Sequence, residues 1–225
     1  KRVDDERQKK DLEYQILQSQ INPHFLYNTL NSIKWMATIQ NATGIAEMTT
    51  SLARLMKNVS KGTAAQIPLK EELDLVKDYF LIQQYRYGGS ITLDCRIESE
   101  ELYRCLIHRF TLQPIIENAL FHGIEPKGCA GHILLSAERV QSDRLGTVLQ
   151  ISVTDNGVGM SREQIEKVLS AQSAPSADFF RQVGIHNVNQ RIHYDFGEDY
   201  GISIDSVEGQ YTTMTITLPY RLNEL

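Results

Sequence analysis

The sequence holds few of the residues that several large classes of protein require. Only three cysteines, Cys95, Cys105 and Cys129, occur among 225 residues. Their spacing fits no metal site, so we expect reduced thiols in a cytosolic environment. No stretch approaches the ~18 consecutive apolar residues of a membrane span, and no signal peptide is visible. The net charge of -5 argues against a nucleic-acid partner, and none is expected.

The remaining composition is ordinary for a globular protein, with 41% hydrophobic and 23% charged residues. The length allows one large domain or two small ones. The segment Ser170–Asp178 is small and polar, which is typical of a mobile loop. Because the chain begins at Lys1 without a methionine, we expect it to be the cytoplasmic part of a longer, membrane-anchored protein.

A proline and a histidine stand together in the middle of a predicted helix. Apolar residues keep alternating three- and four-residue spacings between Leu12 and Ala37, which predicts one apolar seam. Pro23 cannot donate a hydrogen bond to the carbonyl of Ser19, so the helix should bend there. His24 lies off the seam, where a solvent-accessible imidazole could react. The alternative is a surface histidine on a kinked helix.

A second apolar stripe follows. We expect the first helix to end near Ile39, and a loop around Gly44 to lead into a helix over residues 45–60. Two such helices form an antiparallel hairpin that cannot bury both apolar faces alone. Dimerisation into a four-helix bundle would bury them, with an intramolecular bundle that includes the next helix as the alternative. The second stripe consists of Ile45, Met48, Leu52, Leu55 and Val59.

Another amphipathic helix precedes a change in pattern. Pro68 opens a helix over residues 69–86, and Gly88-Gly89 marks the expected domain boundary. From Ile91 onward short strands alternate with helices, which predicts a sheet with helices packed on one face. The expected strands cover residues 91–97, 132–138, 148–155, 201–206 and 212–218.

The segment Leu112–Gly123 reads as a helix with a wide buried face. Glu117 and Asn118 are expected to fall off that face, beside one another. An amide oxygen next to a carboxylate suits Mg²⁺, which prefers hard oxygen ligands and shares its coordination with phosphates. The alternative is that both side chains are simply solvated.

The end of the third predicted strand carries an aspartate. Apolar residues alternate over 149–153, and Asp155 continues the same parity, so its carboxylate should point inward. A buried carboxylate needs a donor, and the exocyclic amine of adenine is one of the right kind. Gly157 and Gly159 would let the backbone approach a flat ring. An Asp-Asn-Gly hairpin turn is the alternative, although it does not need the second glycine.

A later glycine opens another predicted helix, over residues 183–192. Free N–H groups at such a helix start can bind phosphate. One glycine alone is weak support for a phosphate site. Its order in the chain, after the segments that contain Asn118 and Asp155, matters most.

These segments together resemble a known family. QINPHFLYNTLN, around His24, is similar to the phospho-acceptor segment of LytS/YesM-type bacterial sensor histidine kinases. The later segments resemble the N, G1 and G2 boxes of the ATP-binding fold shared by histidine kinases, gyrase, Hsp90 and MutL. The resemblance implies an α+β protein. Residues 1–88 would form a helical-hairpin dimerisation and phospho-acceptor domain, and 89–225 an α/β-sandwich ATP-binding domain of the Bergerat type.

The resemblance also implies roles for individual residues. His24 would accept the γ-phosphoryl group of ATP, Asn118 would bind Mg²⁺ and Asp155 would bind adenine. Glu117 is our candidate for the general base, and Asn28 could serve in dephosphorylation of a partner. The family acts as a homodimer and passes phosphate to a response-regulator receiver domain. Further cofactor-binding positions are His122, Gly157, Gly159, Gly184, Asn187 and Thr212.

The chain also departs from the family pattern. The acidic residue that often follows the phospho-acceptor is Phe25, and the glutamate base of gyrase-type ATPases is replaced by Pro114. The replacement by Pro114 argues against free ATP hydrolysis. The rival interpretation is a non-catalytic, nucleotide-sensing scaffold, in which the altered G2 region reflects lost activity. The other departures are Phe121 at a position where a lysine often lies near the phosphates, His108-Arg109 in a commonly proline-rich stretch, Gln182 for a G2-box glycine and Tyr211 for the glycine before Thr212.

Overall fold

The computed structural model describes residues 23–59, 61, 66–128, 130–170 and 184–223. The chain divides into two compact units, Lys1–Thr63 and Ala64–Leu225, and each is described by itself. Among the described residues, no helix is both long and apolar enough to cross a membrane. The helix expected before Pro23 and most of the polar loop at Ser170–Asp178 lie outside the described residues.

The first unit contains the predicted hairpin, built from α2 (Pro23–Ile39) and α3 (Thr43–Val59). Its turn lies earlier than expected, because Gly44 is already in the first turn of α3. Asn41 takes the left-handed conformation that reverses the chain, with φ 55°. Asparagine tolerates that conformation better than most residues, so no glycine is needed here.

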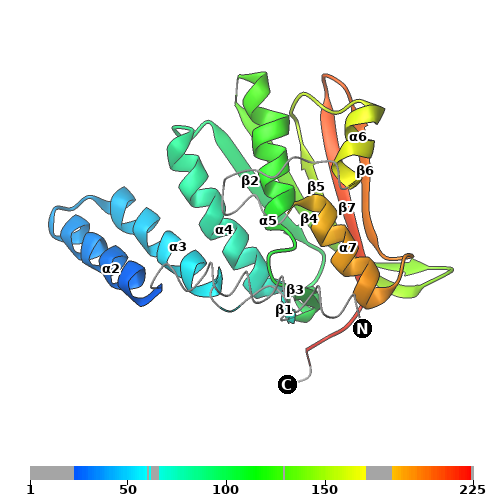
Figure 1. The fold of residues 1–225 in the computed structure, drawn as a ribbon, viewed down its shortest axis with the longest axis horizontal. Coiled ribbons are helices and arrows are strands. Elements are labelled where there is room, and N and C mark those ends of the chain that lie inside the picture. Colours follow the sequence, from blue (N-terminus) through cyan, green and yellow to red (C-terminus); the bar gives the residue numbers. More distant parts are fainter. Residues whose placement is uncertain (1–22, 60, 62–65, 129, 171–183, 224–225) are drawn as a thin grey trace, which may run out of the picture. The chain divides into compact units, whose positions relative to one another are not determined.

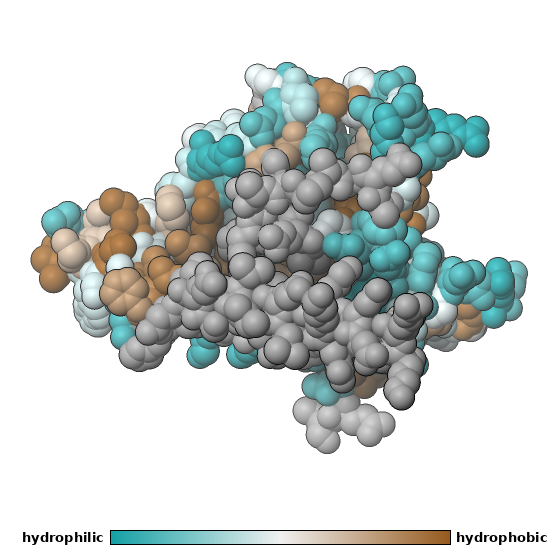
Figure 2. Space-filling model, in the orientation of Figure 1, coloured by the Kyte–Doolittle hydropathy of each residue, from teal (hydrophilic) through white to brown (hydrophobic). Residues whose placement is uncertain are grey.

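The predicted apolar stripe of α3 is only partly buried. Of that stripe only Leu55 is buried, whereas Ile45 is 53% exposed. The small side chains of Thr49, Ser51 and Ala53 are also buried. Figure 2 shows hydrophobic surface over this hairpin. The exposed apolar residues here include Phe25, Trp35, Met36, Ile39 and Ile45.

The second unit is built on a five-stranded sheet with the order β2-β4-β5-β7-β6. The pair β2·β4 is parallel and the other three pairs are antiparallel. All five predicted strands are present, with ends that differ by only a few residues where they differ at all. Their bounds are β2 Ile91–Ile97, β4 Gly131–Ser142, β5 Gly146–Asp155, β6 Gly201–Val207 and β7 Tyr211–Pro219.

Helices α4 (Leu69–Arg86), α5 (Gln113–Asn118) and α7 (Ile185–Phe196) cover one face of this sheet, as Figure 1 shows. The covered face is apolar: Leu149, Ile151 and Val153 of β5 are all buried. The opposite face is polar, and Thr154 and Thr213 join their hydroxyls across β5 and β7 at 2.8 Å. This one-sided arrangement confirms the predicted α+β class.

Several short elements were not predicted. Strands β1 (Gln66–Pro68) and β3 (Leu106–His108) form a separate antiparallel pair, and η1 (Glu100–Arg104) precedes β3. Helix α6 (Arg162–Leu169) begins with a complete capping box, in which the Ser161 hydroxyl and the Gln164 side chain bond reciprocally to the backbone. That Ser-x-x-Gln spacing was a readable start signal.

The compact unit begins at Ala64 and not at the expected boundary, Gly88-Gly89. Helix α4 explains the difference, because Leu73 and Val76 are buried within the second unit. The break in packing between the two units therefore lies before α4, on the N-terminal side of Pro68.

Candidate functional site

The inward parity predicted for Asp155 is confirmed. Asp155 lies at the end of β5 and is 3% exposed. Its Oδ1 accepts a hydrogen bond from the N–H of Gly157 at 2.9 Å. Burial raises the pKa of Asp155 to about 6, against the lowering effects of the Gly157 N–H and the charge of Lys127. The chain then continues toward α6 and does not fold back on β5, so the hairpin-turn alternative is wrong.

Two glycines bring backbone against this carboxylate. A Cβ at Gly123 would lie 2.5 Å from Oδ1 of Asp155, and one at Gly157 would lie 2.2 Å from the carbonyl carbon of Gly123. The N–H of Val158 donates to the carbonyl of Gly123 at 2.9 Å, which locks the two segments together. A side chain at Gly123 would overlap the carboxylate, and one at Gly157 would push the two segments apart.

Thr212 lies directly opposite Asp155 in the register of β5 and β7, and it is 1% exposed. Its hydroxyl is 2.9 Å from that of Ser206, and the Ser206 hydroxyl also accepts the N–H of Met160 at 2.8 Å. Gly159 takes the left-handed conformation, with φ 69°, that brings the loop to this position. Asp155, both G1 glycines and Thr212 thus share one corner of the sheet.

The expectation that Glu117 and Asn118 point away from the buried face is wrong. They are only 7% and 8% exposed. Helix α4 covers this side of α5: the hydroxyl of Tyr79 bonds to Glu117, and burial together with the charge of Glu117 raises the tyrosine pKa. The amide of Gln113 also donates to Glu117 Oε1, at 3.0 Å. Glu117 is therefore a buried carboxylate with two donors.

After Asn118 the helix widens into a π-helix, η2 (Ala119–Ile124), before the 3₁₀ turn η3 (Glu125–Lys127). Such π segments often occur at functional sites. Here η2 places Gly123 against Asp155, while His122 is exposed. The predicted helix over 112–123 is thus present, with a different winding in its second half.

Gly184 precedes α7 as its N-cap, and Asn187 is exposed in the first turn of that helix. A Cβ at Gly184 would meet nothing within 4 Å. Gln182 and the rest of the preceding loop lie outside the described residues. The phosphate-binding role of this helix start stays a prediction.

His24 and Asn28 belong to α2 in the first compact unit, whereas the other candidates belong to the second. The backbone of His24 is helical, and its side chain is outside the described part of the chain. Asn28 is exposed, and its carbonyl accepts the hydroxyl of Ser32 at 3.0 Å.

A buried polar cluster behind the site was not predicted. Glu72 of α4 is fully buried and accepts the N–H groups of Phe110 and Leu112, each at 2.9 Å. Burial raises the pKa of Glu72 to about 7, although the three backbone N–H groups at 110–112 and the charge of Arg191 oppose the rise. The place of Glu72 on the buried face of α4 was its only sequence signal.

Helix α7 holds the same loop from its other side. Arg191 donates to the hydroxyl of Thr111 at 3.0 Å, and Asp195 lies 2.8 Å from Nε2 of His108. Burial lowers the pKa of His108, as does the charge of Arg191, while Asp195 opposes that change. The His108-Arg109 departure from the family pattern thus begins the loop that is clamped between α4 and α7.

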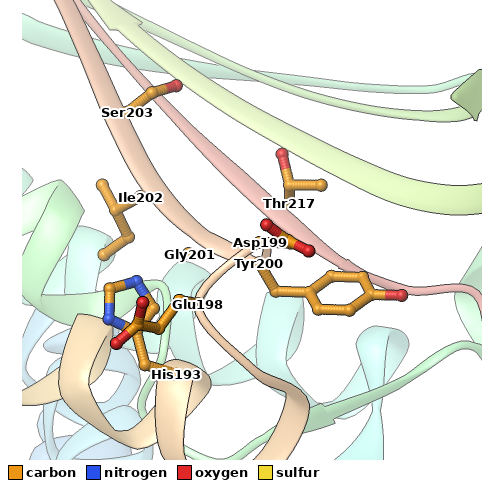
Figure 3. Close-up of a pocket in the computed structure, with 8 residues that line it drawn as sticks. All are labelled: His193, Glu198, Asp199, Tyr200, Gly201, Ile202, Ser203 and Thr217. Atoms are coloured by element: carbon orange, nitrogen blue, oxygen red, sulfur yellow. The ribbon is translucent and has the colours of Figure 1, made fainter. Parts of the chain in front are cut away.

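An open pocket lies at the opposite end of α7 from Gly184, where the helix leads into β6 (Figure 3). None of the predicted site residues lines it, and its Asp199 is paired with Arg144 at 2.6 Å. In the described part of the chain no three His, Cys, Asp or Glu side chains gather as a metal site would require. The pocket is lined by His193, Glu198, Asp199, Tyr200, Gly201, Ile202, Ser203 and Thr217.

Two family models match this chain. Residues 12–91 match the histidine kinase family, and residues 108–222 match the histidine kinase-, DNA gyrase B- and HSP90-like ATPase family. The first match contains His24 and the second contains Asn118, Asp155 and Thr212. The chain therefore belongs to the histidine kinases, with an ATP-binding domain of the type shared with gyrase and HSP90.

Two of the similar curated proteins are sensor histidine kinases. YesM of Bacillus subtilis (strain 168) is 36% identical over 214 residues, which is 94% of this chain and 34% of that protein. BtsS of Escherichia coli (strain K12) is 31% identical over 219 residues, 96% of this chain and 35% of that protein. The chain thus spans about a third of the length of these relatives. The solved histidine kinase domain of the Erythrobacter litoralis EL346 blue-light activated kinase is 15% identical, with a TM-score of 0.46, and the match covers 88% of this chain and 94% of that one.

Proposed function

We propose that this chain binds ATP and Mg²⁺, phosphorylates itself on His24, and passes the phosphoryl group to an aspartate of a response regulator. The observation that carries the proposal is the buried carboxylate of Asp155 between Gly123 and Gly157. Its Oδ1 is bonded by Gly157, and no donor among the described residues bonds to its Oδ2. The exocyclic amine of adenine is a donor that fits this position.

The glycines of the site fit the same ligand. A Cβ at Gly123 would occupy the space against the carboxylate, and one at Gly157 would overlap the backbone of Gly123, so both glycines keep backbone close to a place where a flat ring could lie. Thr212, joined to the loop through Ser206, would hold the strand end beside the ring. Gly184 and Asn187, at the start of α7, would face the phosphates, because free N–H groups there attract anions.

Asn118 would contribute one amide oxygen to Mg²⁺, which commonly completes its coordination with phosphates and water. Its neighbour Glu117 stays our candidate for the general base. Gln113 and Tyr79 both donate hydrogen bonds to the Glu117 carboxylate and hold it in place. To accept a proton, Glu117 would have to keep these two bonds or give one of them up.

Bound ATP and Mg²⁺ would supply an activated phosphoryl group whose charge is partly neutralised. The neutral imidazole of His24 has an available lone pair at physiological pH. A nitrogen–phosphorus bond forms as the bond to the β-phosphate oxygen breaks, and the imidazole releases its N–H proton. A carboxylate oxygen of the regulator then takes the phosphoryl group, which regenerates neutral His24 after it regains a proton.

The surface of the hairpin supports a homodimer. Trp35, Met36 and Ile39 are 68%, 61% and 78% exposed on α2, and Ile45 is 53% exposed on α3. A second copy could bury these side chains in a four-helix bundle, which is a common solution for two-helix hairpins. We also propose that the whole protein is anchored in a membrane through residues outside this chain.

Incubation of the chain with γ-labelled ATP and Mg²⁺ tests the proposal. A histidine kinase acquires an acid-labile, base-stable label that moves to an added receiver domain. A chain that binds ATP but never becomes labelled is instead the nucleotide-sensing scaffold.

A further inference from the structure

Arg86, the last residue of α4, is held over an aromatic ring of the N-box segment. Its guanidinium carbon lies 5.5 Å from the ring centroid of Phe121 and 5.5 Å from that of Tyr87. Cations are attracted to the faces of such rings without losing their charge. The two rings therefore position this guanidinium and leave it positively charged.

Among the described residues, no carboxylate neutralises the charge of Arg86. Its residue is exposed, and within the described ranges its guanidinium forms no ion pair with a carboxylate. Glu125, on η3, accepts the hydroxyl of Tyr87 at 2.7 Å instead. An exposed, oriented arginine without a carboxylate partner is well suited to bind an anion.

The location of Phe121 indicates which anion Arg86 would bind. Phe121 stands between Asn118 and Gly123 on one continuous helical stretch, and Gly123 lies against Asp155. A nucleotide with its adenine at Asp155 and its metal-bound phosphates at Asn118 must extend along this stretch. The guanidinium over the Phe121 ring then lies beside that path.

We infer that Arg86 binds the β- and γ-phosphates of ATP, and that α4 supplies the cation which the N-box segment of this chain lacks at Phe121. The planar guanidinium offers several donors in a fixed fork, which matches two phosphate oxygens at once. The inference rests on the proposed nucleotide site at Asp155 and adds a ligand-binding residue from a different helix.

Calorimetric titration with AMP and with a non-hydrolysable ATP analogue, both with Mg²⁺, tests the inference. Both ligands share the adenine contact at Asp155, and only the analogue has β- and γ-phosphates. For Arg86→Gln we expect the affinity for the analogue to fall ten-fold or more, with AMP affinity unchanged within two-fold. Arg144→Gln removes the same charge from an exposed pair with Asp199 and should change neither affinity.

A second substitution checks the geometry. In the Arg86→Gln background, Phe121→Lys returns a cation to the same place and should restore most of the lost affinity for the analogue. A lack of rescue overturns the claim that the phosphates pass over Phe121.

The remaining outcomes separate the two proposals. If Arg86→Gln weakens the binding of AMP and of the analogue equally, Arg86 only packs α4 against η2. If the binding of both ligands is unchanged, Arg86 has no role in binding. Either result overturns the inference. If the unaltered chain binds neither ligand, the proposed function fails and this inference fails with it.

Discussion

The carboxylate of Glu72 accepts a 2.9 Å hydrogen bond from the backbone N–H of Leu112, the residue that caps the N-box helix α5. This bond joins α4 to the start of the helix that carries Asn118. Arg191 of α7 contacts the same loop through Thr111, so three helices meet at one buried turn. A displacement of α4 would therefore be transmitted to the predicted nucleotide site.

The Glu72 carboxyl should make stability depend on pH. Because burial raises its pKa from 4.5 to about 7, the folded state keeps a proton that the unfolded state releases between those values. The free energy of unfolding should thus fall as the pH rises from about 4.5 to about 7. Urea unfolding at a series of pH values should show a smaller fall for Glu72→Gln.

Asp155 contributes to the same fall, since its pKa is raised to about 6, so part of the slope should persist in Glu72→Gln. Glu71→Gln, on the exposed side of the same helix, is the matched control and should keep the whole slope. A slope that Glu72→Gln leaves unchanged would show that Glu72 does not hold the proton.

Asp155→Asn should abolish measurable nucleotide binding while the fold survives. The charge-assisted hydrogen bond that it removes is worth about 1.5–3 kcal/mol, and each ~1.4 kcal/mol is ten-fold in affinity. The unaltered chain should also bind an ATP analogue more weakly as the pH falls below about 6, where Asp155 takes up its proton. Calorimetric titration measures both effects, and an unchanged affinity in Asp155→Asn would refute the adenine assignment.

Gly157→Ala should destabilise the second unit, because its Cβ would lie 2.2 Å from the backbone of Gly123. Overpacking of this kind costs about 1–3 kcal/mol, or roughly 2–12 °C in the melting temperature at this size. Gly184→Ala is the control, since its Cβ meets nothing within 4 Å, and its melting temperature should fall much less. Equal melting temperatures for both variants would contradict the close contact.

Asn28→Ala tests a phosphatase role. Asn28 follows His24 by one helical turn on α2, where its exposed amide could hold a water near the phosphorylated aspartate of a docked regulator. The alternative is a surface amide without a role. The substitution should leave labelling of His24 within a few fold and slow phosphate loss from the regulator about ten-fold, a barrier change of ~1.4 kcal/mol. Loss of both activities together, or a core that never accelerates dephosphorylation, would disprove the role.

The sequence predicted the elements whose patterns are local. The alternation that ends at Asp155 identified β5 and its inward carboxylate, because side chains in a strand alternate strictly between two faces. The same reasoning failed at Glu117, where helical periodicity indicates one buried face and cannot show that α4 covers a second. Burial of Glu117 depends on Tyr79, which lies far away in the sequence.

Long-range contacts explain the other differences. The apolar stripe of α3 predicted burial in a dimeric four-helix bundle, with an intramolecular bundle as the alternative. Within the single chain most of this stripe is not buried, and Ile45 is exposed. Glu72 looked like any polar residue of an amphipathic helix, since its partners are backbone N–H groups of a loop that no local pattern locates. The three-residue strands β1 and β3 are equally non-local.

The central claim is that His24 accepts the phosphoryl group, and one comparison tests it most directly. The unaltered chain and His24→Gln are incubated with γ-labelled ATP and Mg²⁺, and the acid-labile, base-stable label is counted while ATP affinity is measured in parallel. The chain has six histidines, so the others serve as an internal control. We predict a label on the unaltered chain and none on His24→Gln, with equal ATP affinities. A label that persists near its normal level in His24→Gln would contradict the account, because another residue would then be the acceptor.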